Sequence, residues 1–318
     1  MKESTNNVYL TGVLVKKDFE EVDCDVKNEQ GQVIGKDKAI RGVAIIRTTD
    51  GSENEVKYYA TRLTKKGAES ALFKGLKTVM NEYKSLEQFP NEADVVKIGA
   101  GKISVNDYVN SKSELKCYNE VKANFINRVE SKDLETTLQE SKFEVEGVVE
   151  TITDEIIKEV PTGNKIINLM IIGYEGTLIP MKLTIIESMV TAFNSAGFYE
   201  GGYAKFVGKL VNTKETTEII EKMGFGEDNV KIVTKTVSRF EVTSGNPLGT
   251  PMDKGITVEE WGQAKTKRQL KLDKKKEEAN NNSPSANPFG VDATSTTSTT
   301  ANNNTTFNPF SGANPFAS

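Results

Sequence analysis

The chain has 318 residues, a formal net charge of −4 and no histidine, and hydrophobic residues make up 36% of it. This length is enough for two ordinary domains, each with its own core. The lack of histidine excludes His-based acid–base catalysis, Ser-His triads and most zinc sites. The sequence also contains neither a GxxxxGK[ST] loop nor a GxGxxG run. We therefore expect a protein that is not an enzyme and that needs no metal or other cofactor.

The expected location follows from the termini and the cysteines. No apolar run approaches the roughly 20 residues of a membrane-spanning helix. The opening, MKESTNNVYL, has no apolar signal segment behind its single lysine. Two cysteines, Cys24 and Cys117, do not make a disulfide framework and fit a reducing compartment. We expect a cytoplasmic protein, in the host cytoplasm if phage-encoded, with no membrane partner.

The charge is distributed unevenly along the chain. Residues 265–278 contain seven Lys/Arg and three Asp/Glu, whereas residues 1–264 carry a net charge of −7. A nucleic-acid binder with such a body must gather its positive charge locally, because the field of the whole body repels phosphates. We expect the basic segment at 265–278 to add phosphate contacts.

The first half begins with a strand in NNVYLTGVLVKKDF, in which apolar residues occupy both faces. Residues 19–38 are polar and contain two glycines, which predicts a long hairpin loop. Residues 39–63 predict two strands that meet at the Asp50-Gly51 turn. Residues 67–84 change to a helical period, and residues 93–110 and 114–131 then predict two further strands.

The second half repeats this order. Residues 141–152 contain VEGVV, which matches the LTGVL of the first strand. Residues 164–186 predict two strands around Glu175-Gly176, and the helix that follows ends at Gly197. Residues 201–213 and 230–245 predict the fourth and fifth strands. The two halves therefore have the order of two tandem modules with one architecture.

Five strands with a helix between the third and the fourth are typical of the OB-fold, a small Greek-key barrel. Glycine in the first strand suits the strong coil that such a barrel needs there. We predict a mainly β protein with two tandem OB-fold-like five-stranded barrels, each with one helix between strands three and four. A generic two-domain β protein, such as a pair of sandwiches, is the alternative.

Composition sets the expected domain boundaries. We place the first OB-fold-like domain at 1–139, the second at 140–245, and a linker with a basic helix at 246–279. Residues 280–318 are mostly Ser, Thr, Asn and Ala and should form a disordered tail.

The tail carries three Asn-Pro-Phe triplets, which end at Phe289, Phe310 and Phe316. Asn and Pro favour a turn that presents each Phe ring, and three copies raise the local concentration for a partner, so we predict that these rings bind another protein.

The opening NNVYLTGVLV resembles the first strand of bacterial and phage single-stranded-DNA-binding proteins. That family joins OB-fold barrels to a flexible tail with a Pro-Phe tip. The resemblance covers the strand order over 7–243 and the tail plan over 280–318, and the larger phage form with two barrels in one chain is the most similar. It implies that the protein binds single-stranded DNA without catalysis during phage DNA replication, recombination or repair, and recruits replication and recombination proteins through the tail.

The tail departs from the family pattern in two ways. The bacterial tip is acidic and ends in Phe, whereas this tail has one acidic residue and continues for two residues after Phe316. Asn-Pro-Phe triplets also resemble ligands of eukaryotic endocytic adaptor domains. The alternative function is a structural or assembly adaptor that uses the barrels and the triplets for protein–protein contacts, and the acidic body favours it.

Binding of a single strand by an OB-fold needs aromatic faces for bases and cations for phosphates, mostly on the second and third strands. The candidates in the first half are Arg41, Arg47, Lys57, Tyr58, Tyr59, Arg62, Lys65 and Lys66. The candidates in the second half are Lys165, Tyr174, Lys182, Lys205 and Arg239. Successive strand residues point to opposite faces, so we expect Tyr59 to be exposed, on the face of Lys57, and Tyr58 to lie in the core. We also expect Phe206 in the core.

Overall fold

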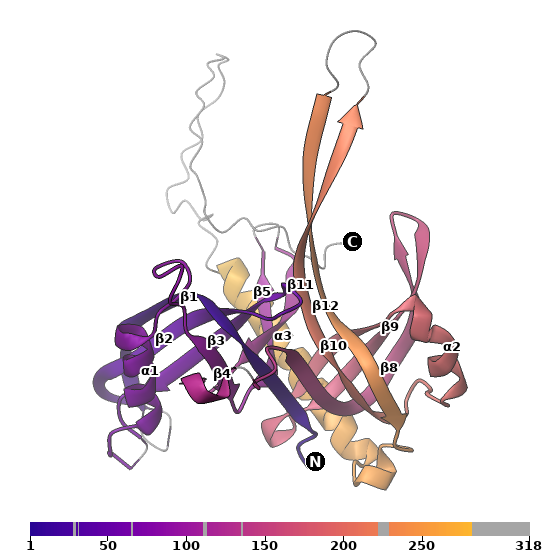
Figure 1. Ribbon diagram of the computed structural model, residues 1–318. Coiled ribbons are helices and arrows are strands. Elements are labelled where there is room, and N and C mark those ends of the chain that lie inside the picture. Colours follow the sequence, from indigo (N-terminus) through magenta and orange to yellow (C-terminus); the bar gives the residue numbers. More distant parts are fainter. Residues whose placement is uncertain are drawn as a thin grey trace, which may run out of the picture.

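The structure, a computed structural model, describes residues 1–27, 30, 32–64, 66–110, 113–134, 136–221 and 229–281. Within these residues, twelve strands form one connected sheet that three helices accompany (Figure 1). The strands of the first half are β1 (Asn6–Lys27), β2 (Val33–Arg47), β3 (Glu53–Thr61), β4 (Val95–Gly99), β5 (Lys102–Val109), β6 (Leu115–Lys122) and β7 (Phe125–Arg128). The strands of the second half are β8 (Ser141–Ile157), β9 (Val160–Ile172), β10 (Leu178–Ile185), β11 (Tyr203–Glu221) and β12 (Asn229–Pro247). The helices are α1 (Ala71–Glu82), α2 (Glu187–Ser195) and α3 (Val258–Asn281).

The second half closes into a five-stranded barrel. β8 pairs with β9, β9 with β10, β10 with β12 in parallel, and β12 with β11, which returns to β8. α2 lies between β10 and β11 in the chain. The mainly β fold and a closed five-stranded barrel, both predicted from the sequence, are confirmed. Phe206 is fully buried inside it, as expected.

The strands of the first half pair in the order β1, β2, β3, β6 and β5, with a parallel pair between β3 and β6. β4 pairs with both β1 and β7. The side chain of Asn6 joins β1 to β5, because its amide donates to the carbonyl of Ile103 at 2.8 Å and accepts from the Ile103 N–H at 3.0 Å. α1 follows β3 and begins after Ser70, whose side chain accepts from the backbone N–H of Phe73.

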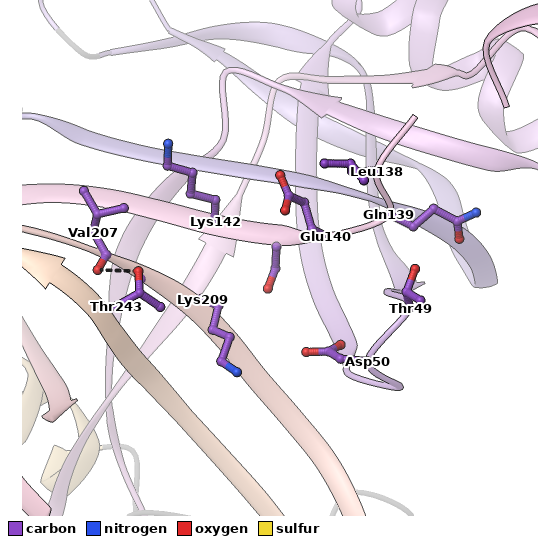
Figure 2. Close-up of a pocket in the computed structure, with 11 residues that line it drawn as sticks. Thr49, Asp50, Leu138, Gln139, Glu140, Lys142, Val207, Lys209 and Thr243 are labelled. Carbon is purple, nitrogen blue, oxygen red and sulfur yellow. Dashed lines mark hydrogen bonds between the residues drawn. The ribbon is translucent and has the colours of Figure 1, made fainter. Parts of the chain in front are cut away.

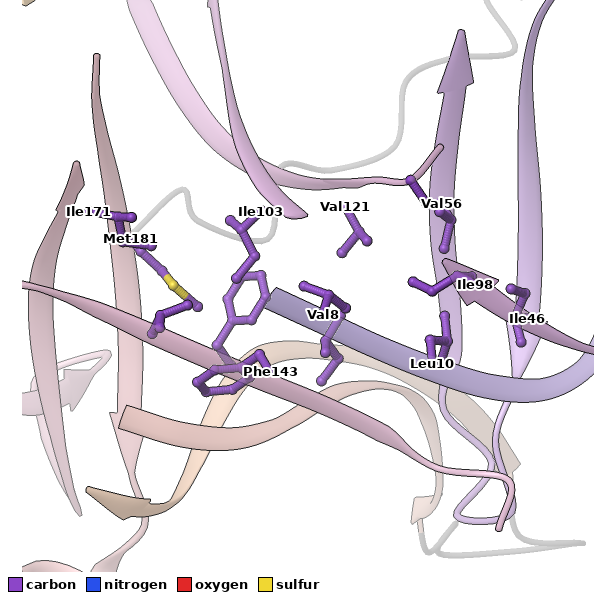
Figure 3. Close-up of a cluster of buried hydrophobic side chains, with 14 of the residues drawn as sticks. Val8, Leu10, Ile46, Val56, Ile98, Ile103, Val121, Phe143, Ile171 and Met181 are labelled. Atoms are coloured by element: carbon purple, nitrogen blue, oxygen red, sulfur yellow. The ribbon is translucent and has the colours of Figure 1, made fainter. Parts of the chain in front are cut away.

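The two halves are joined through their first strands. Residues 6–10 of β1 pair with residues 141–145 of β8 in antiparallel register. One hydrophobic cluster consequently runs through both halves, and Figure 3 shows Val8 of β1 close to Phe143 of β8. The halves are therefore connected by a shared sheet and a shared core, which fixes how their outer faces sit relative to each other.

Two glycines occupy matching places in the first strand of each half. A Cβ atom on Gly12 would collide with the carbonyl oxygen of Arg47, and one on Gly147 would collide with that of Met170. The register of β1 against β2 and of β8 against β9 shifts two or three residues later. Only glycine allows the neighbouring strand to approach this closely, so the repeated LTGVL and VEGVV runs mark the same structural need.

The hairpin loop predicted at 19–38 is wrong over most of its length. β1 continues to Lys27 and β2 begins at Val33, so much of this polar stretch is strand. Cross-strand ion pairs hold the extension, between Asp23 and Lys38 and between Glu20 and Arg41. The polar composition suggested a loop, but a ladder outside the core needs no apolar side chains, since backbone hydrogen bonds and charge pairs are enough.

The strands predicted at 93–110 and 114–131 are each divided in two. The first is interrupted at Ala100, which has a left-handed backbone with φ 53°, and at Gly101, where a Cβ atom would collide with Val8. The second changes partner at Ala123 and Asn124, whose N–H groups donate to the carbonyls of Lys57 and Gly99. These breaks let the chain pass from one neighbouring strand to another.

Two features extend beyond the predicted elements at the C-terminal side. The hairpin of β11 and β12 is paired as far as Glu221 and Asn229 and projects from the body (Figure 1). α3 covers the predicted basic segment and includes the first two residues of the predicted tail. The remainder of the tail, with Phe289, Phe310 and Phe316, lies outside the described residues.

Tyr58 carries a buried hydroxyl group that has no hydrogen-bond partner among the described residues. Its ring packs against Phe19, with 5.6 Å between the centroids. Because an unpaired buried hydroxyl costs free energy, we expect Tyr58→Phe to raise the free energy of unfolding by about 1 kcal/mol. Urea titrations of the two proteins measure this change. A clear loss of stability in the variant would contradict the assignment of an unpaired hydroxyl.

Candidate nucleic-acid interface

The outer face of β2 and β3 carries the most exposed predicted aromatic of the first half. Tyr59 is 59% exposed, whereas Tyr58 is buried, so the predicted facing of the two tyrosines is confirmed. Tyr59 lies opposite Arg41 on β2, and Arg41 in turn lies opposite Glu20 on β1. The guanidinium group of Arg41 donates to Glu20 at 2.5 Å. A ring and a cation thus stand side by side on this face, with the cation held by a carboxylate.

Lys57, two residues before Tyr59, connects this face to β6. Its amine donates to the carboxylate of Glu120 at 2.7 Å and to the hydroxyl of Tyr118 at 3.3 Å. The amine also lies 5.4 Å from the centroid of the Tyr118 ring. Lys122 pairs with the other oxygen of Glu120 at 2.8 Å. Glu120 therefore holds two lysines at the edge of an aromatic surface.

The ionisation of this cluster is set by opposing effects. Burial disfavours the charged form of Glu120, but hydrogen bonds from Lys122 and Lys57 outweigh it and lower the pKa of its carboxyl group. Burial likewise opposes the charge on Lys57, and its bonds to Glu120 and Tyr118 outweigh this and raise the pKa of the amine. The pair therefore stays ionised at neutral pH, as an ion pair beside this surface.

The aromatic surface continues onto β5 and β6 through two tyrosines that the sequence analysis missed. The rings of Tyr108 and Tyr118 meet edge to face with 5.8 Å between centroids, and Tyr108 is 37% exposed. The side-chain amide of Asn106 donates to the Tyr118 hydroxyl at 2.7 Å. The prediction searched only the second and third strands. The alternation of KISVNDYV was a usable signal, because Tyr108 lies an odd number of residues from the apolar Ile103 and Val105 and therefore faces outward.

A polar row crosses the outer face of the second barrel. Thr151 of β8 pairs with Asn168 of β9, and Asn168 pairs with Lys182 of β10. Arg239 of β12 stands next to Lys182, since Leu183 and Phe240 pair in the parallel ladder. Asn168 donates to the Thr151 hydroxyl at 2.7 Å. The structure thus brings together two of the predicted cations of this half, Lys182 and Arg239.

Glu155 lies close to these two cations. Burial raises the pKa of its carboxyl group, but hydrogen bonds from Asn164 and Thr162, together with the charges of Lys182 and Arg239, shift the pKa below its usual value. Arg239 itself forms an ion pair with Glu241 at 2.8 Å. Lys182 is exposed and forms no ion pair with any described residue. Lys182 is therefore the cation of this row that is most readily offered to a phosphate.

A groove of about 280 Å³ lies where β6 of the first half faces this row. Its lining residues are Cys117, Tyr118, Asn119, Glu150, Thr151, Asn168, Leu169, Pro180, Met181 and Lys182. The side-chain amide of Asn119 donates to the carbonyl of Pro180 at 2.7 Å and so bridges the two halves. We call this groove, which lies between β6 of the first half and the polar row of the second, the junction groove.

α3 packs against both halves beside the junction groove. The guanidinium group of Arg268 donates to Asp107 of β5 at 2.9 Å and to the carbonyl of Leu178 of β10 at 3.3 Å. Lys265 pairs with Glu150 at 3.1 Å. The basic segment predicted to contact phosphates therefore uses part of its charge inside the molecule, because these side chains face the body.

The other predicted cations lie apart from one another, and most of them form an ion pair with a carboxylate. Arg47 pairs with Glu53, Arg62 with Asp37, Lys165 with Asp154, and Lys205 with Glu144. Tyr174 is 74% exposed, in the turn between β9 and β10, away from the polar row. Lys66 is exposed and unpaired among the described residues, and Lys65 lies outside them. Seven of the nine described candidate cations thus form an ion pair with a carboxylate. The predicted site is therefore not the basic surface that the sequence suggested.

A second cavity, of about 610 Å³, lies between the turn after β2 and the strands β8, β11 and β12 (Figure 2). Lys142 and Lys209 share it with Asp50 and Glu140, and it contains no aromatic ring. None of the predicted site residues lines it. The mixed charges and the lack of a stacking surface make it a poorer candidate for nucleic acid than the face described above.

No group of three or more His, Cys, Asp or Glu side chains in the described part of the chain is arranged to hold a metal ion. No helix among the described residues is long and apolar enough to cross a membrane.

Comparison with known proteins gives a family and a set of similar structures. A protein-family model described as YorF matches residues 5–278. The search of curated proteins finds no match. A solved structure of a deletion mutant of the single-stranded DNA binding protein from Thermus aquaticus is 12% identical and has a TM-score of 0.42, with 78% of this chain and 96% of that chain covered. A Replication Protein A heterotrimer bound to ssDNA is 12% identical and has a TM-score of 0.19, with coverages of 76% and 50%. Because both TM-scores are low, the functional argument depends on the geometry.

Proposed function

We propose that this chain, which belongs to the YorF family, binds single-stranded DNA and does not act as an enzyme. The observation that carries the proposal is the row of Tyr59, Lys57, Tyr118 and Tyr108 on the outer face of the first half. Tyr59 and Tyr108 are exposed and Tyr118 is half-buried. Accessible rings beside amines are what successive bases and phosphates of a single strand require. Because every base has a π-face, such a surface binds strands of many sequences.

The ion pairs shape how this surface would bind. Arg41 and Lys57 can contact a phosphate only when they share or leave their carboxylate partners, Glu20 and Glu120. Each such exchange offsets part of the attraction and reduces the net release of counterions. We therefore expect stacking to contribute more to the affinity than charge, and the salt dependence to be shallow for a protein of this kind.

We further propose that the two halves are tandem OB-fold-like barrels, with boundaries near 139 and 245. Several features support this: the third strand of each half pairs in parallel with a later strand, a helix follows that third strand, and Gly12 and Gly147 occupy matching positions.

A role in phage DNA replication, recombination or repair in the host cytoplasm is part of the same proposal. Its support is the resemblance of the opening strand and the tail to phage and bacterial proteins.

The proposal includes a recruiting role for the tail. Changing Phe289, Phe310 and Phe316 together to Ala should leave the thermal unfolding temperature and the oligonucleotide affinity unchanged. It should abolish capture of replication or recombination proteins, because three weak Phe anchors act together through avidity. Affinity capture with the intact chain and the triple variant, with mass spectrometry of the bound proteins, measures this. Equal capture by both would contradict the recruiting role.

A fluorescence titration with labelled oligo-dT at low salt tests the proposed function. We expect sub-micromolar binding of a strand of roughly 25 nucleotides, which is long enough for both halves. A duplex of the same length serves as the control and should bind more weakly, since its bases are not available for stacking. Absence of sub-micromolar binding to the single strand would overturn the proposal.

One observation favours a second candidate, an adaptor that assembles proteins. Seven of the nine described candidate cations are already paired with carboxylates, as expected for a surface that does not receive phosphates. An adaptor would retain its partners after nuclease treatment and would show no salt-dependent affinity for DNA. The titration above, together with nuclease treatment of captured complexes, distinguishes the two functions.

A further inference from the structure

We propose that the junction groove is a subsite for one nucleotide, at the point where a single strand crosses from the first half to the second. The inference rests on the proposed function and adds to it a defined crossing point. The groove lies between the aromatic surface of β5 and β6 and the polar row on β8, β9, β10 and β12. Its volume of about 280 Å³ is close to the lower end of small-ligand pockets, which suits a single base with its sugar.

The groove offers hydrogen-bonding and charged groups to a nucleotide. On the β6 side, the groove is lined by Cys117, Tyr118 and Asn119. The Tyr118 ring itself lies on the outer face of β6, where its hydroxyl accepts hydrogen bonds from Asn106 and Lys57, so a strand would leave this ring as it enters the groove. On the opposite side, the amide of Asn168 donates one hydrogen bond to Thr151 and retains its carbonyl oxygen for a base edge. Lys182 supplies an amine that is exposed and forms no ion pair with any described residue, so it can bind a phosphate without displacing a carboxylate.

The walls of the groove are fixed by contacts between the halves. Asn119 of β6 donates to the carbonyl of Pro180, which sets the distance between the two sides. Glu150, another lining residue, is neutralised by Lys265 of α3 at 3.1 Å, so its charge does not repel a phosphate. The groove is therefore preformed, and a strand that enters it needs to displace neither a side-chain pair nor a helix.

Because of the position of the groove, the contribution of its residues to affinity should depend on the length of the DNA strand. A strand that covers only Tyr59 and Tyr118 ends before the polar row, whereas a longer strand must pass Lys182 to reach the second barrel. We expect Lys182→Ala and Asn168→Ala each to weaken binding of an oligo-dT of roughly 25 nucleotides by about tenfold. Neither should change binding of an oligo-dT of roughly 6 nucleotides. Lys182→Ala should also reduce the slope of log Kd against log salt by about one, since one phosphate contact is lost.

The experiment measures both oligonucleotides against the wild type, the two variants, Lys182→Arg and the control Lys142→Ala. Lys142 is exposed on β8 outside the groove, so its loss tests whether removing any lysine weakens binding. Retention of affinity by Lys182→Arg and Lys142→Ala, with loss in Lys182→Ala for the longer strand alone, supports the subsite. No effect of Lys182→Ala and Asn168→Ala on the longer strand, or an equal effect on both strands, overturns it. If the wild type binds neither oligonucleotide, the proposed function itself fails, which is a different result from failure of the subsite.

Discussion

Arg268→Ala should lower the free energy of unfolding by about 3 kcal/mol, because it leaves the buried carboxylate of Asp107 without its ion-pair partner. The side chains of Arg268 and Asp107 are 13% and 1% exposed, so water replaces little of the lost interaction. For a chain of this size the change corresponds to a fall of roughly 6 to 12 °C in Tm. Calorimetry or thermal unfolding followed by circular dichroism measures it.

Two further variants distinguish the loss of the ion pair from a general effect of substitutions in α3 on stability. Lys267→Ala removes the neighbouring exposed lysine of α3 and should leave Tm unchanged, since Lys267 forms no ion pair among the described residues. Adding Asp107→Asn to Arg268→Ala should recover part of the stability, because the buried charge is then absent. If Arg268→Ala unfolds at the temperature of the wild type, α3 does not hold the two halves together.

The position of α3 makes this pair important for the proposed function as well. Arg268 contacts a strand of each half, and α3 packs on Val148, Met170 and Leu178, which form a second hydrophobic cluster with Ile256 and Ala264. The helix is strongly polar and would be unstable alone, so these few contacts keep it in place. Loss of the Arg268 contact should therefore widen the junction groove and weaken binding of long oligonucleotides more than of short ones.

Tyr59→Ala should weaken binding of single-stranded DNA by about 1–3 kcal/mol, or roughly 5- to 150-fold in Kd, if its ring carries a base. The ring is 59% exposed, so Tm should change little. Tyr59→Phe should retain the affinity, because the ring and not the hydroxyl makes the contact. Fluorescence anisotropy with labelled oligo-dT measures all three proteins.

Tyr174→Ala is the matched control for this experiment. Tyr174 is an exposed tyrosine at the turn between β9 and β10, away from the proposed path of the strand. Its loss should leave Kd unchanged. If Tyr174→Ala weakens binding and Tyr59→Ala does not, the strand lies on the end of the second barrel instead of the face of β2 and β3.

The facing of residues within strands could be predicted from the sequence, because side chains alternate with a period of two. This was enough to place Tyr59 outside, and Tyr58 and Phe206 inside. The repeated order of elements likewise predicted a five-stranded barrel. The extended hairpin of β1 and β2 was missed, because the polar composition and the two glycines of residues 19–38 suggested a loop. Residues 22–26, VDCDV, do alternate with the period of a strand, and this was the signal that could have found the extension.

The candidate site was only partly accessible to sequence reasoning. The bond between Lys57 and Glu120 joins residues 63 positions apart, and that between Arg268 and Asp107 spans 161 positions. No local sequence pattern indicates partners so far apart in the chain. The pairing of the predicted cations with carboxylates could therefore be seen only in the structure. Tyr118 was missed for a similar reason, because its nearness to Lys57 depends on the parallel pairing of β3 and β6.

Photochemical cross-linking tests the central claim most directly. A bromodeoxyuridine-substituted single strand of roughly 25 nucleotides is bound to the full chain, irradiated and digested, and the cross-linked peptides are identified by mass spectrometry. The account predicts cross-links in the peptides that contain Tyr59 and Tyr118, and their loss from the first site in Tyr59→Ala. Cross-links confined to the hairpin of β11 and β12 or to the cavity of Lys142 and Lys209, with none on β3 or β6, would contradict it.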